Sequence, residues 1–343
     1  MARGLGIAAP NAFKGTATAS KAAAAIGHAC WEVGLDCVEI PMSDGGDGLI
    51  EVLGGANRTT TVTGPLGDPI DAAWQLRGGT AVIEMATASG LVAAGGTEAN
   101  DPIGASTTGT GELIDKALDA GATRIIVGLG GSATTDGGLG AMRAVTALAR
   151  ARRVEIIAAC DVETTFLDAA EIFAPQKGAT AVHVKLLTRR LERIAQMYSE
   201  EFQIDVRNLP GSGAAGGLGG ALAALGARLT SGVELVADEL DLFDHLEAAE
   251  LIITGEGRLD ATSFAGKVVG GVAEIALDAG VRCVAIVGDE APGWRDDLTD
   301  HQRRSAADHL EVMSMSELVG NEHAIAQPLD AIETAARLVL TGS

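Results

Sequence analysis

Several loops of this sequence combine glycine with hydroxyl, carboxylate and basic side chains, the residue types that phosphate and metal chemistry require. The richest loop covers residues 128–138, between an apolar run at 125–127 and a helical pattern that begins at Leu139. Glycines there let backbone N–H groups approach an anion at the start of a helix. The simpler alternative is a tight turn whose hydroxyl and carboxylate groups cap that helix. The residues singled out are Gly130, Gly131, Ser132, Thr134 and Asp136.

Charged groups also follow other predicted strands. Lys14 comes just after the strand predicted at 4–10, and Asp44 and Asp47 come after the strand predicted at 37–42. Ligands of open α/β sheets lie beyond the carboxyl ends of the strands, so these positions favour binding or catalysis. Two carboxylates that flank glycines suit Mg²⁺ or a hydroxyl-rich ligand. A solvated lysine and a capped turn are the alternatives.

The second half of the chain repeats this arrangement. Asp161 follows a strand predicted at 154–160, and Arg258 follows a strand predicted at 251–254. Lys177 lies in a short loop, and an arginine can clamp a carboxylate or phosphate with two parallel hydrogen bonds. A second glycine-rich block offers either another backbone cradle or a helix with close-packed neighbours. Its candidate binding residues are Gly213, Gly216 and Gly217.

Composition narrows the class of protein. The chain has 343 residues, 47% of them hydrophobic but only 3% aromatic, which favours an Ala- and Val-rich α/β protein. Its net charge of −21 makes nucleic acid an unsuitable partner. The four cysteines have no metal-binding spacing, and no run reaches the roughly 20 apolar residues of a membrane span. We therefore expect a cytoplasmic protein that does not bind membranes.

The order of predicted elements indicates two domains. Strand, helix and strand alternate at the start of the chain and again in its last third, whereas consecutive strands without helices follow in between. We expect residues 1–58 and 245–343 to form one domain, with residues 59–244 inserted as a mixed α/β domain. The consecutive strands are predicted at 58–63, 72–76 and 80–85.

Phosphoryl transfer uses this mixture of backbone N–H groups, cations, carboxylates and a positioned hydroxyl. The sequence contains no G-x-x-x-x-G-K-[ST], HRD or DFG motif, which excludes the P-loop and protein kinase classes. An NAD(P)-dependent oxidoreductase is an alternative, because the glycines of residues 128–133 match a degenerate dinucleotide motif. The carboxylate expected about 20 residues later is missing. A catalytically impaired homologue that binds a small acid is the other alternative.

Eight motifs in order along the chain resemble the bacterial glycerate kinase type 1 family. The resemblance implies ATP- and Mg²⁺-dependent phosphorylation of D-glycerate, with 2-phosphoglycerate as the favoured product. It also implies that the domain built from both chain ends is a flavodoxin-like parallel sheet. The motifs are Ala9-Pro-Asn-Ala-Phe-Lys14, Ser43-Asp-Gly-Gly-Asp-Gly48, Thr63-Gly-Pro-Leu-Gly67, Gly130-Gly-Ser-Ala-Thr-Thr-Asp-Gly-Gly138, Ala159-Cys-Asp-Val162, Pro175-Gln-Lys-Gly-Ala179, Gly213-Ala-Ala-Gly-Gly217 and Ile253-Thr-Gly-Glu-Gly-Arg-Leu-Asp260.

Together with the residue types, this resemblance assigns roles to the site. We expect a monomer or homodimer whose partner is the small-molecule substrate. Catalysis is assigned to Asp136, Asp161 and Lys14, substrate binding to Asp44, Asp47, Lys177 and Arg258, and metal binding to Asp44 and Asp136. Nucleotide binding is assigned to Gly130, Gly131, Ser132, Thr134, Gly213, Gly216 and Gly217.

Two departures from the family pattern lie near Asp161. Family members usually carry a few tens more residues before the Ala-Cys-Asp-Val motif, and only residues 147–153 remain here. The family's Asn-Pro-Leu loop after that motif is replaced by residues 163–168. The residue types around Asp136 keep the family pattern, so its assignment follows more directly than that of Asp161.

Overall fold

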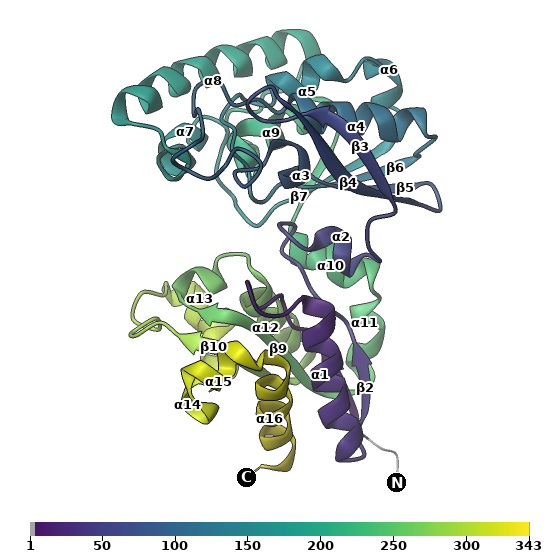
Figure 1. The fold of residues 1–343 in the computed structure, drawn as a ribbon, viewed down its shortest axis with the longest axis vertical. Helices are drawn as coiled ribbons and strands as arrows, with labels where there is room; N and C mark the ends of the chain where they lie inside the picture. Colours follow the sequence, from purple (N-terminus) through teal and green to yellow (C-terminus); the bar gives the residue numbers. More distant parts are fainter. Residues whose placement is uncertain (1–3, 343) are drawn as a thin grey trace. The chain divides into compact units, whose positions relative to one another are not determined.

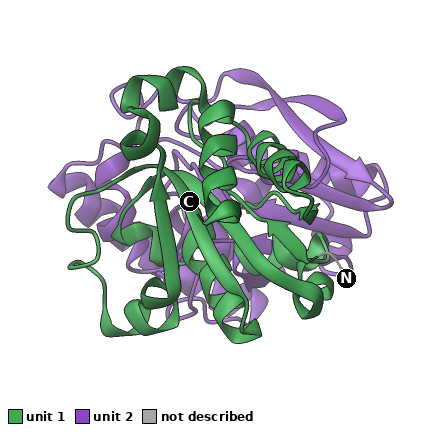
Figure 2. Cartoon of the chain, turned by 90° about the horizontal axis from the view of Figure 1, so that it is seen from below, with its two compact units in different colours: residues 1–44, 233–343 green, residues 45–232 purple. Residues whose placement is uncertain are grey.

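The computed structural model describes residues 4–342 and has the mixed α/β architecture that the sequence predicts, with two sheets (Figure 1). The chain divides into two compact units. One contains residues 1–44 and 233–343, and the other contains residues 45–232 (Figure 2). None of the helices in the described part has the length and apolar composition that a bilayer crossing requires.

The first unit is built on a five-stranded sheet in which all strands are parallel. The strand order is β11-β10-β9-β1-β2, so the first strand of the chain lies beside one that follows some 240 residues later. The inner strands β1, β9 and β10 each contain a buried apolar run, which suits a sheet covered on both faces. Their bounds are β1 Leu5–Ala8, β2 Asp36–Glu39, β9 Ala249–Leu259, β10 Arg282–Glu290 and β11 Leu310–Ser314.

Helices cover both faces of this sheet. Helices α1 (Ala19–Glu32) and α16 (Pro328–Thr341) pack against each other and share one core cluster with the strands. Leu251 and Ile253 of β9 belong to that cluster, so the intervening Ile252 points to the opposite face, where α12 packs on β9 and β10. The remaining helices are α10 Gly232–Glu239, α11 Leu242–His245, α12 Val268–Ala279, α13 Asp300–Ser305, α14 Met315–Val319 and α15 Asn321–Ala326.

The second unit contains a six-stranded mixed sheet in the order β3-β4-β5-β6-β7-β8. The first three strands form an antiparallel meander, and β5 to β8 are parallel. The meander confirms the consecutive strands expected from the sequence, whereas β8 was not expected because three residues carry too little pattern. The bounds are β3 Arg58–Thr63, β4 Pro69–Arg77, β5 Thr80–Glu84, β6 Arg124–Gly128, β7 Glu155–Ala159 and β8 Arg228–Thr230.

One long helix organises the core of this unit. Helix α8 places Tyr198 in edge-to-face contact with Phe166 and Phe202, and the buried Tyr198 hydroxyl donates to the carbonyl of Gly137 at 2.8 Å. The loop at residues 128–138 is thereby tied to the core. The helices are α2 Leu49–Val52, α3 Ala86–Ser89, α4 Thr108–Asp119, α5 Leu139–Ala144, α6 Leu148–Ala151, α7 Ala169–Phe173, α8 Ala181–Phe202 and α9 Ala214–Ala224.

The limits of the compact units differ from the expected limits at 58 and 245. Residues 45–57 belong to the second unit, because the Glu84 carboxylate accepts from the N–H groups of Gly48 and Ile50 and ties α2 to β5. Helix α10 belongs almost entirely to the first unit. The strand that set the expected boundary begins at Arg58, after Gly48 and Ile50, so its pattern gives no sign of these contacts.

Candidate active site

The first unit has a pocket of about 380 Å³ at the carboxyl ends of β1 and β9. These strands are neighbours, but their connections leave in opposite directions, since β1 leads to β2 on one side and β9 leads to β10 on the other. Open α/β sheets bind ligands at such a switch point because the diverging loops leave a crevice. The polar lining consists of Asn11, Lys14, Thr16, Asp44, Glu256, Arg258, Lys267, Asp289 and Asn321.

Local packing holds Lys14 at this pocket. The buried Phe13 anchors its loop, with the Phe13 N–H donating to Ala17 O at 2.9 Å and the Thr16 hydroxyl donating to Phe13 O at 2.9 Å. Gly257 packs closely on this turn, because an added Cβ would lie 3.3 Å from the Lys14 nitrogen. The lysine side chain itself is exposed, so its ammonium group is available to a ligand.

Glu256 is the buried acid of the pocket, with 9% of its surface exposed. Burial raises the pKa of its carboxyl group to about 6, while the hydrogen bond with Ser263 and the charge of Lys267 act in the opposite direction. Within residues 4–342, its Oε1 atom is buried and has no hydrogen-bond partner. Such an acceptor is uncommon in a folded protein, and it indicates a group that a bound molecule completes.

In the second unit, predicted site residues meet at the carboxyl ends of β5, β6 and β7. Gly130 packs against the loop that follows Asp44, because an added Cβ would lie 2.4 Å from Gly46 Cα. Asp47 is exposed beside the same loop, with its Oδ1 atom 3.2 Å from the position of a Cβ on Gly131. Asp161 follows β7, so it lies at this edge of the sheet as well. The structure thus gathers Asp47, Asp161 and the glycine-rich loop on one rim.

The two halves of the glycine-rich loop differ in what their N–H groups do. In the described part of the chain, the N–H groups of Gly130, Gly131 and Ser132 donate no hydrogen bond. The N–H of Gly137 donates to Gly216 O, and that of Gly138 donates to Asp136 Oδ1, both at 3.0 Å. The first half is therefore available to an anion, whereas the second half is used to hold the fold.

Lys177 lies beneath this loop and does not face solvent. Its side chain is 3% exposed, and Nζ donates to Ser132 Oγ and to Thr134 O, both at 2.7 Å. Burial lowers the pKa of Lys177 to about 7, and the charge of Asp136 opposes that shift. Both acceptors are uncharged oxygens, so Lys177 fixes the loop by hydrogen bonds and, when protonated, places a positive charge behind it.

Asp136 has its carboxylate engaged with the chain. Oδ2 accepts from the Thr107 N–H at 2.9 Å and hydroxyl at 2.8 Å, from the Gly140 N–H at 3.1 Å and from the Ser106 hydroxyl at 3.4 Å, while Oδ1 accepts from Gly138. These donors lie at the starts of α4 and α5, so Asp136 joins two helix N-termini. These contacts favour a structural role for Asp136, and the metal-binding and catalytic roles assigned from the sequence stay predictions.

The second glycine-rich block supports the loop from behind. An added Cβ on Gly216 would lie 2.0 Å from Thr134 O, and an added Cβ on Gly217 would lie 2.8 Å from Gly137 Cα. The Gly213 N–H donates to Thr164 O at 2.9 Å. Of the two interpretations that the sequence left open, these contacts favour close packing.

The structure divides the predicted residues between the two units. Lys14, Asp44 and Arg258 line the first-unit pocket, and the remaining predicted residues belong to the second unit. The sequence assignment gave no role to three charged residues of the pocket, Glu256, Lys267 and Asp289. Glu256 had a signal, since it follows an apolar strand and stands two residues before Arg258.

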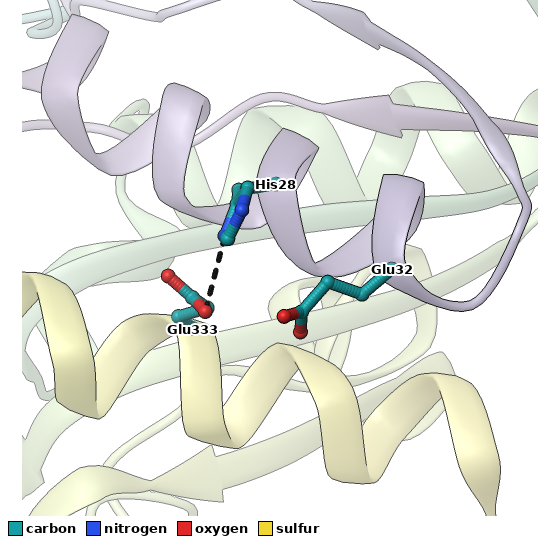
Figure 3. A group of neighbouring side chains, drawn as sticks. All are labelled: His28, Glu32 and Glu333. Atoms are coloured by element: carbon teal, nitrogen blue, oxygen red, sulfur yellow. Dashed lines mark ion pairs between the residues drawn. The ribbon is translucent and has the colours of Figure 1, made fainter.

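A third cluster of polar side chains lies on helices α1 and α16 of the first unit. His28, Glu32 and Glu333 approach one another closely enough to share a cation, and His28 Nδ1 is 3.1 Å from Glu333 Oε1 (Figure 3). The guanidinium group of Arg337 binds both glutamates, at 2.6 Å and 2.8 Å. Since Arg337 supplies the positive charge, this cluster is an ion-pair network between the helices.

Known proteins are similar to this chain over most of its length. The sequence model of the Glycerate kinase family matches residues 7–149 and 146–341. The chain is 40% identical over 310 residues to glycerate 2-kinase of Escherichia coli K12, covering 79% of this chain and 81% of that protein. It is 38% identical over 328 residues to glycerate kinase of Halalkalibacterium halodurans, covering 84% and 86%.

A solved structure is similar over nearly the whole chain. It is a crystal structure of a protein assigned as glycerate kinase 2 from Salmonella typhimurium LT2, with a TM-score of 0.78 and 33% identity over 99% of this chain and 98% of that one. The two segments matched by the family model overlap at residues 146–149, where the sequence departs from the family pattern. There the short helix α6 leads directly to β7.

Proposed function

Because the chain belongs to the Glycerate kinase family, we propose that it transfers the γ-phosphoryl group of ATP to D-glycerate. The name of the Escherichia coli relative, glycerate 2-kinase, supports the 2-hydroxyl as the acceptor. The observation that carries the proposal is the pair of rims at strand ends, one with unpaired N–H groups and one with exposed cations. Phosphoryl transfer needs both kinds of site.

The glycine-rich loop of the second unit is proposed to bind the phosphates of ATP. The N–H groups of Gly130, Gly131 and Ser132 supply donors, and Lys177 adds positive charge from below. Donors fixed before the ligand arrives cost no reorganisation during the reaction, so they stabilise developing charge well. In this proposal Thr134, Gly213, Gly216 and Gly217 act by holding the loop rather than by touching the nucleotide.

Asp47 is the carboxylate that best fits Mg²⁺ in the second unit. It is exposed beside the loop, and within the described residues it makes no hydrogen bond or ion pair. Magnesium sites of this kind use one or two carboxylates together with substrate phosphates. When bound, Mg²⁺ neutralises phosphate charge and orients the oxygens. Asp161 is proposed to act at the same rim, whereas the contacts of Asp136 support a structural role.

The pocket of the first unit is proposed to bind D-glycerate. Lys14 and Arg258 are exposed cations suited to a carboxylate, and Asp44 contributes an acceptor. The sheet order, numbered along this unit as 2-1-3-4-5, supports the expected flavodoxin-like assignment of this unit. A small hydroxy acid has one carboxylate and one or two hydroxyls, which matches a lining of cations and acids.

A direct assay tests this function. The purified chain, supplied with Mg·ATP and D-glycerate, is expected to form ADP and phosphoglycerate, with the position of the phosphate read by ³¹P and ¹H NMR. Formation of 3-phosphoglycerate would correct the position while leaving the kinase assignment intact. Absence of turnover with D-glycerate and other hydroxy acids, together with a change in NADH absorbance, would favour an oxidoreductase instead.

A further inference from the structure

The contacts of Glu256 within the fold do not account for the burial of its carboxyl group. It lies at the carboxyl end of β9, the central strand of the sheet, and lines the pocket of the first unit. The side chain is more than nine-tenths buried, and in the described part of the chain its Oε1 atom has no hydrogen-bond donor. A buried acceptor left without a donor destabilises the fold, and a ligand that supplies the donor would remove that cost.

The basic residues of the pocket do not supply that donor. Lys267 is the cation whose charge lowers the pKa of Glu256, but its Nζ donates to Thr262 Oγ1 at 2.8 Å. Lys14 and Arg258 are exposed and form no ion pair with Glu256 within residues 4–342. The charged side chains that line the pocket balance, with three cations and three acids: Lys14, Arg258, Lys267, Asp44, Glu256 and Asp289. Oε1 therefore needs a hydrogen-bond donor rather than a further charge, and a neutral donor suits it.

We propose that Glu256 recognises the hydroxyl group of the acceptor, while Lys14 and Arg258 bind its carboxylate. This inference rests on the proposed function, and it gives the first-unit pocket a defined substrate class, a small acid with a hydroxyl beside the carboxylate. The hydroxyl proton points to Oε1 and satisfies the buried acceptor. An acid without a hydroxyl leaves that acceptor unpaired, which is the strongest way for a site to reject an analogue.

The wild-type chain itself provides the first test, which no folding defect can disturb. Dissociation constants of D-glycerate and of propanoate, which has the carboxylate but no hydroxyl, are measured by NMR titration at pH 8 without nucleotide. We expect D-glycerate to bind at least about 10-fold more tightly, the discrimination of one hydrogen bond to a charged group. Equal affinities would overturn the proposal.

Two variants assign the discrimination to Glu256. Glu256→Met has a similar length and no acceptor, so the affinity ratio of the two acids is expected to fall to within about 3-fold of unity. Glu256→Gln keeps a neutral acceptor and is expected to give an intermediate ratio. Glu250→Gln, on the same strand but exposed and outside the pocket, is the matched control and is expected to keep the wild-type ratio.

The ratio of the affinities for D-glycerate and propanoate shows whether Glu256 recognises the hydroxyl group or only supports the fold. If Glu256 only held the end of the strand in place, its loss would weaken the binding of D-glycerate and of propanoate equally. The ratio of their affinities would then stay unchanged, and that result in Glu256→Met would overturn the proposal. The kinase assay is read independently. ADP formation with an unchanged ratio in Glu256→Met would refute this inference and keep the proposed function. A collapsed ratio in a chain that forms no ADP would retain the hydroxyl site and refute the kinase.

Discussion

The two rims of this protein use the same residue types in opposite ways. In the first-unit pocket, the cations Lys14 and Arg258 are exposed and the acid Glu256 is buried. At the glycine-rich loop of the second unit, the cation Lys177 is buried and the acid Asp47 is exposed. The exposed member of each set can meet a ligand. The buried member either stabilises the loop by hydrogen bonds, as Lys177 does, or accepts a hydrogen bond from a ligand, as we infer for Glu256.

Physical chemistry explains this division. A buried charged group carries a desolvation penalty, so it must form hydrogen bonds within the fold or bind a ligand. Lys177 has two neutral oxygens within 2.7 Å, whereas Glu256 Oε1 has no partner among the described residues. Burial alone therefore does not identify a functional residue, and the hydrogen-bond partners decide. Asp136 accepts from five donors, so by the same criterion its contacts favour a role in the scaffold.

The largest effect is expected at the exposed acid of the second unit. Asp47→Asn should lower kcat by about 100-fold or more, because a ligand of the proposed Mg²⁺ site loses its charge. Thermal stability should remain unchanged, since Asp47 is exposed and forms no hydrogen bond within residues 4–342. Steady-state kinetics over a Mg²⁺ series measure this. Asp68→Asn, in an exposed turn of the same unit, is the control, and full activity in Asp47→Asn would refute the metal assignment.

The next largest effect is expected on stability, at Asp136, whose carboxylate accepts several hydrogen bonds within the fold. Asp136→Asn places an amide where backbone N–H groups donate, so the free energy of unfolding should fall by about 2–3 kcal/mol. The activity of the folded fraction should fall much less than in Asp47→Asn. Chemical denaturation with parallel kinetics measures both quantities. Unchanged stability with a 100-fold loss of kcat would instead support the catalytic role that the sequence suggested for Asp136.

A smaller effect is expected at the buried Lys177, on the way the free energy of unfolding depends on pH. The pKa of Lys177 is about 7 in the fold against an ordinary 10.5, so between these values the unfolded chain holds more protons and the free energy of unfolding rises with pH. The penalty of the buried charge is fully present below pH 7. Lys177→Met should flatten that rise by at least about 1 kcal/mol.

Denaturation of the wild type and Lys177→Met at several pH values measures the difference, in which titrations of all other groups cancel. Parallel stability curves for the two proteins would show that Lys177 stays protonated in the fold. The buried residue would then carry its charge permanently, which would strengthen the contrast with the exposed cations of the first-unit pocket.

The smallest effect is expected at the cluster on α1 and α16, which lies in neither rim. His28→Ala removes a half-exposed ion pair and should change the free energy of unfolding by less than about 1 kcal/mol. Added Zn²⁺ should not raise the melting temperature, because Arg337 occupies both glutamates. A Zn²⁺-dependent increase that His28→Ala abolishes would reveal a metal site there.

Much of the fold could be predicted from local patterns. The apolar runs that end before Asp161 and before Glu256 are strands in the structure, and the consecutive strands after residue 58 form the meander. The short β8 and the unit limits at 44 and 232 could not be predicted. They depend on contacts such as Glu84 with Gly48 and Ile50, which join segments more than 30 residues apart and leave no periodic signal.

By itself, the sequence determined which residue types stand at the ends of the strands, because strands and glycine-rich turns follow from local patterning. It also determined the family, through eight motifs in a fixed order. Only the tertiary structure decided which of these groups face a ligand. Lys177 and Lys14 look alike in the sequence, but one is buried against Ser132 and the other is exposed in a pocket. The reason is that burial and hydrogen-bond partners come from segments distant in the chain, and they set what a charged side chain can do.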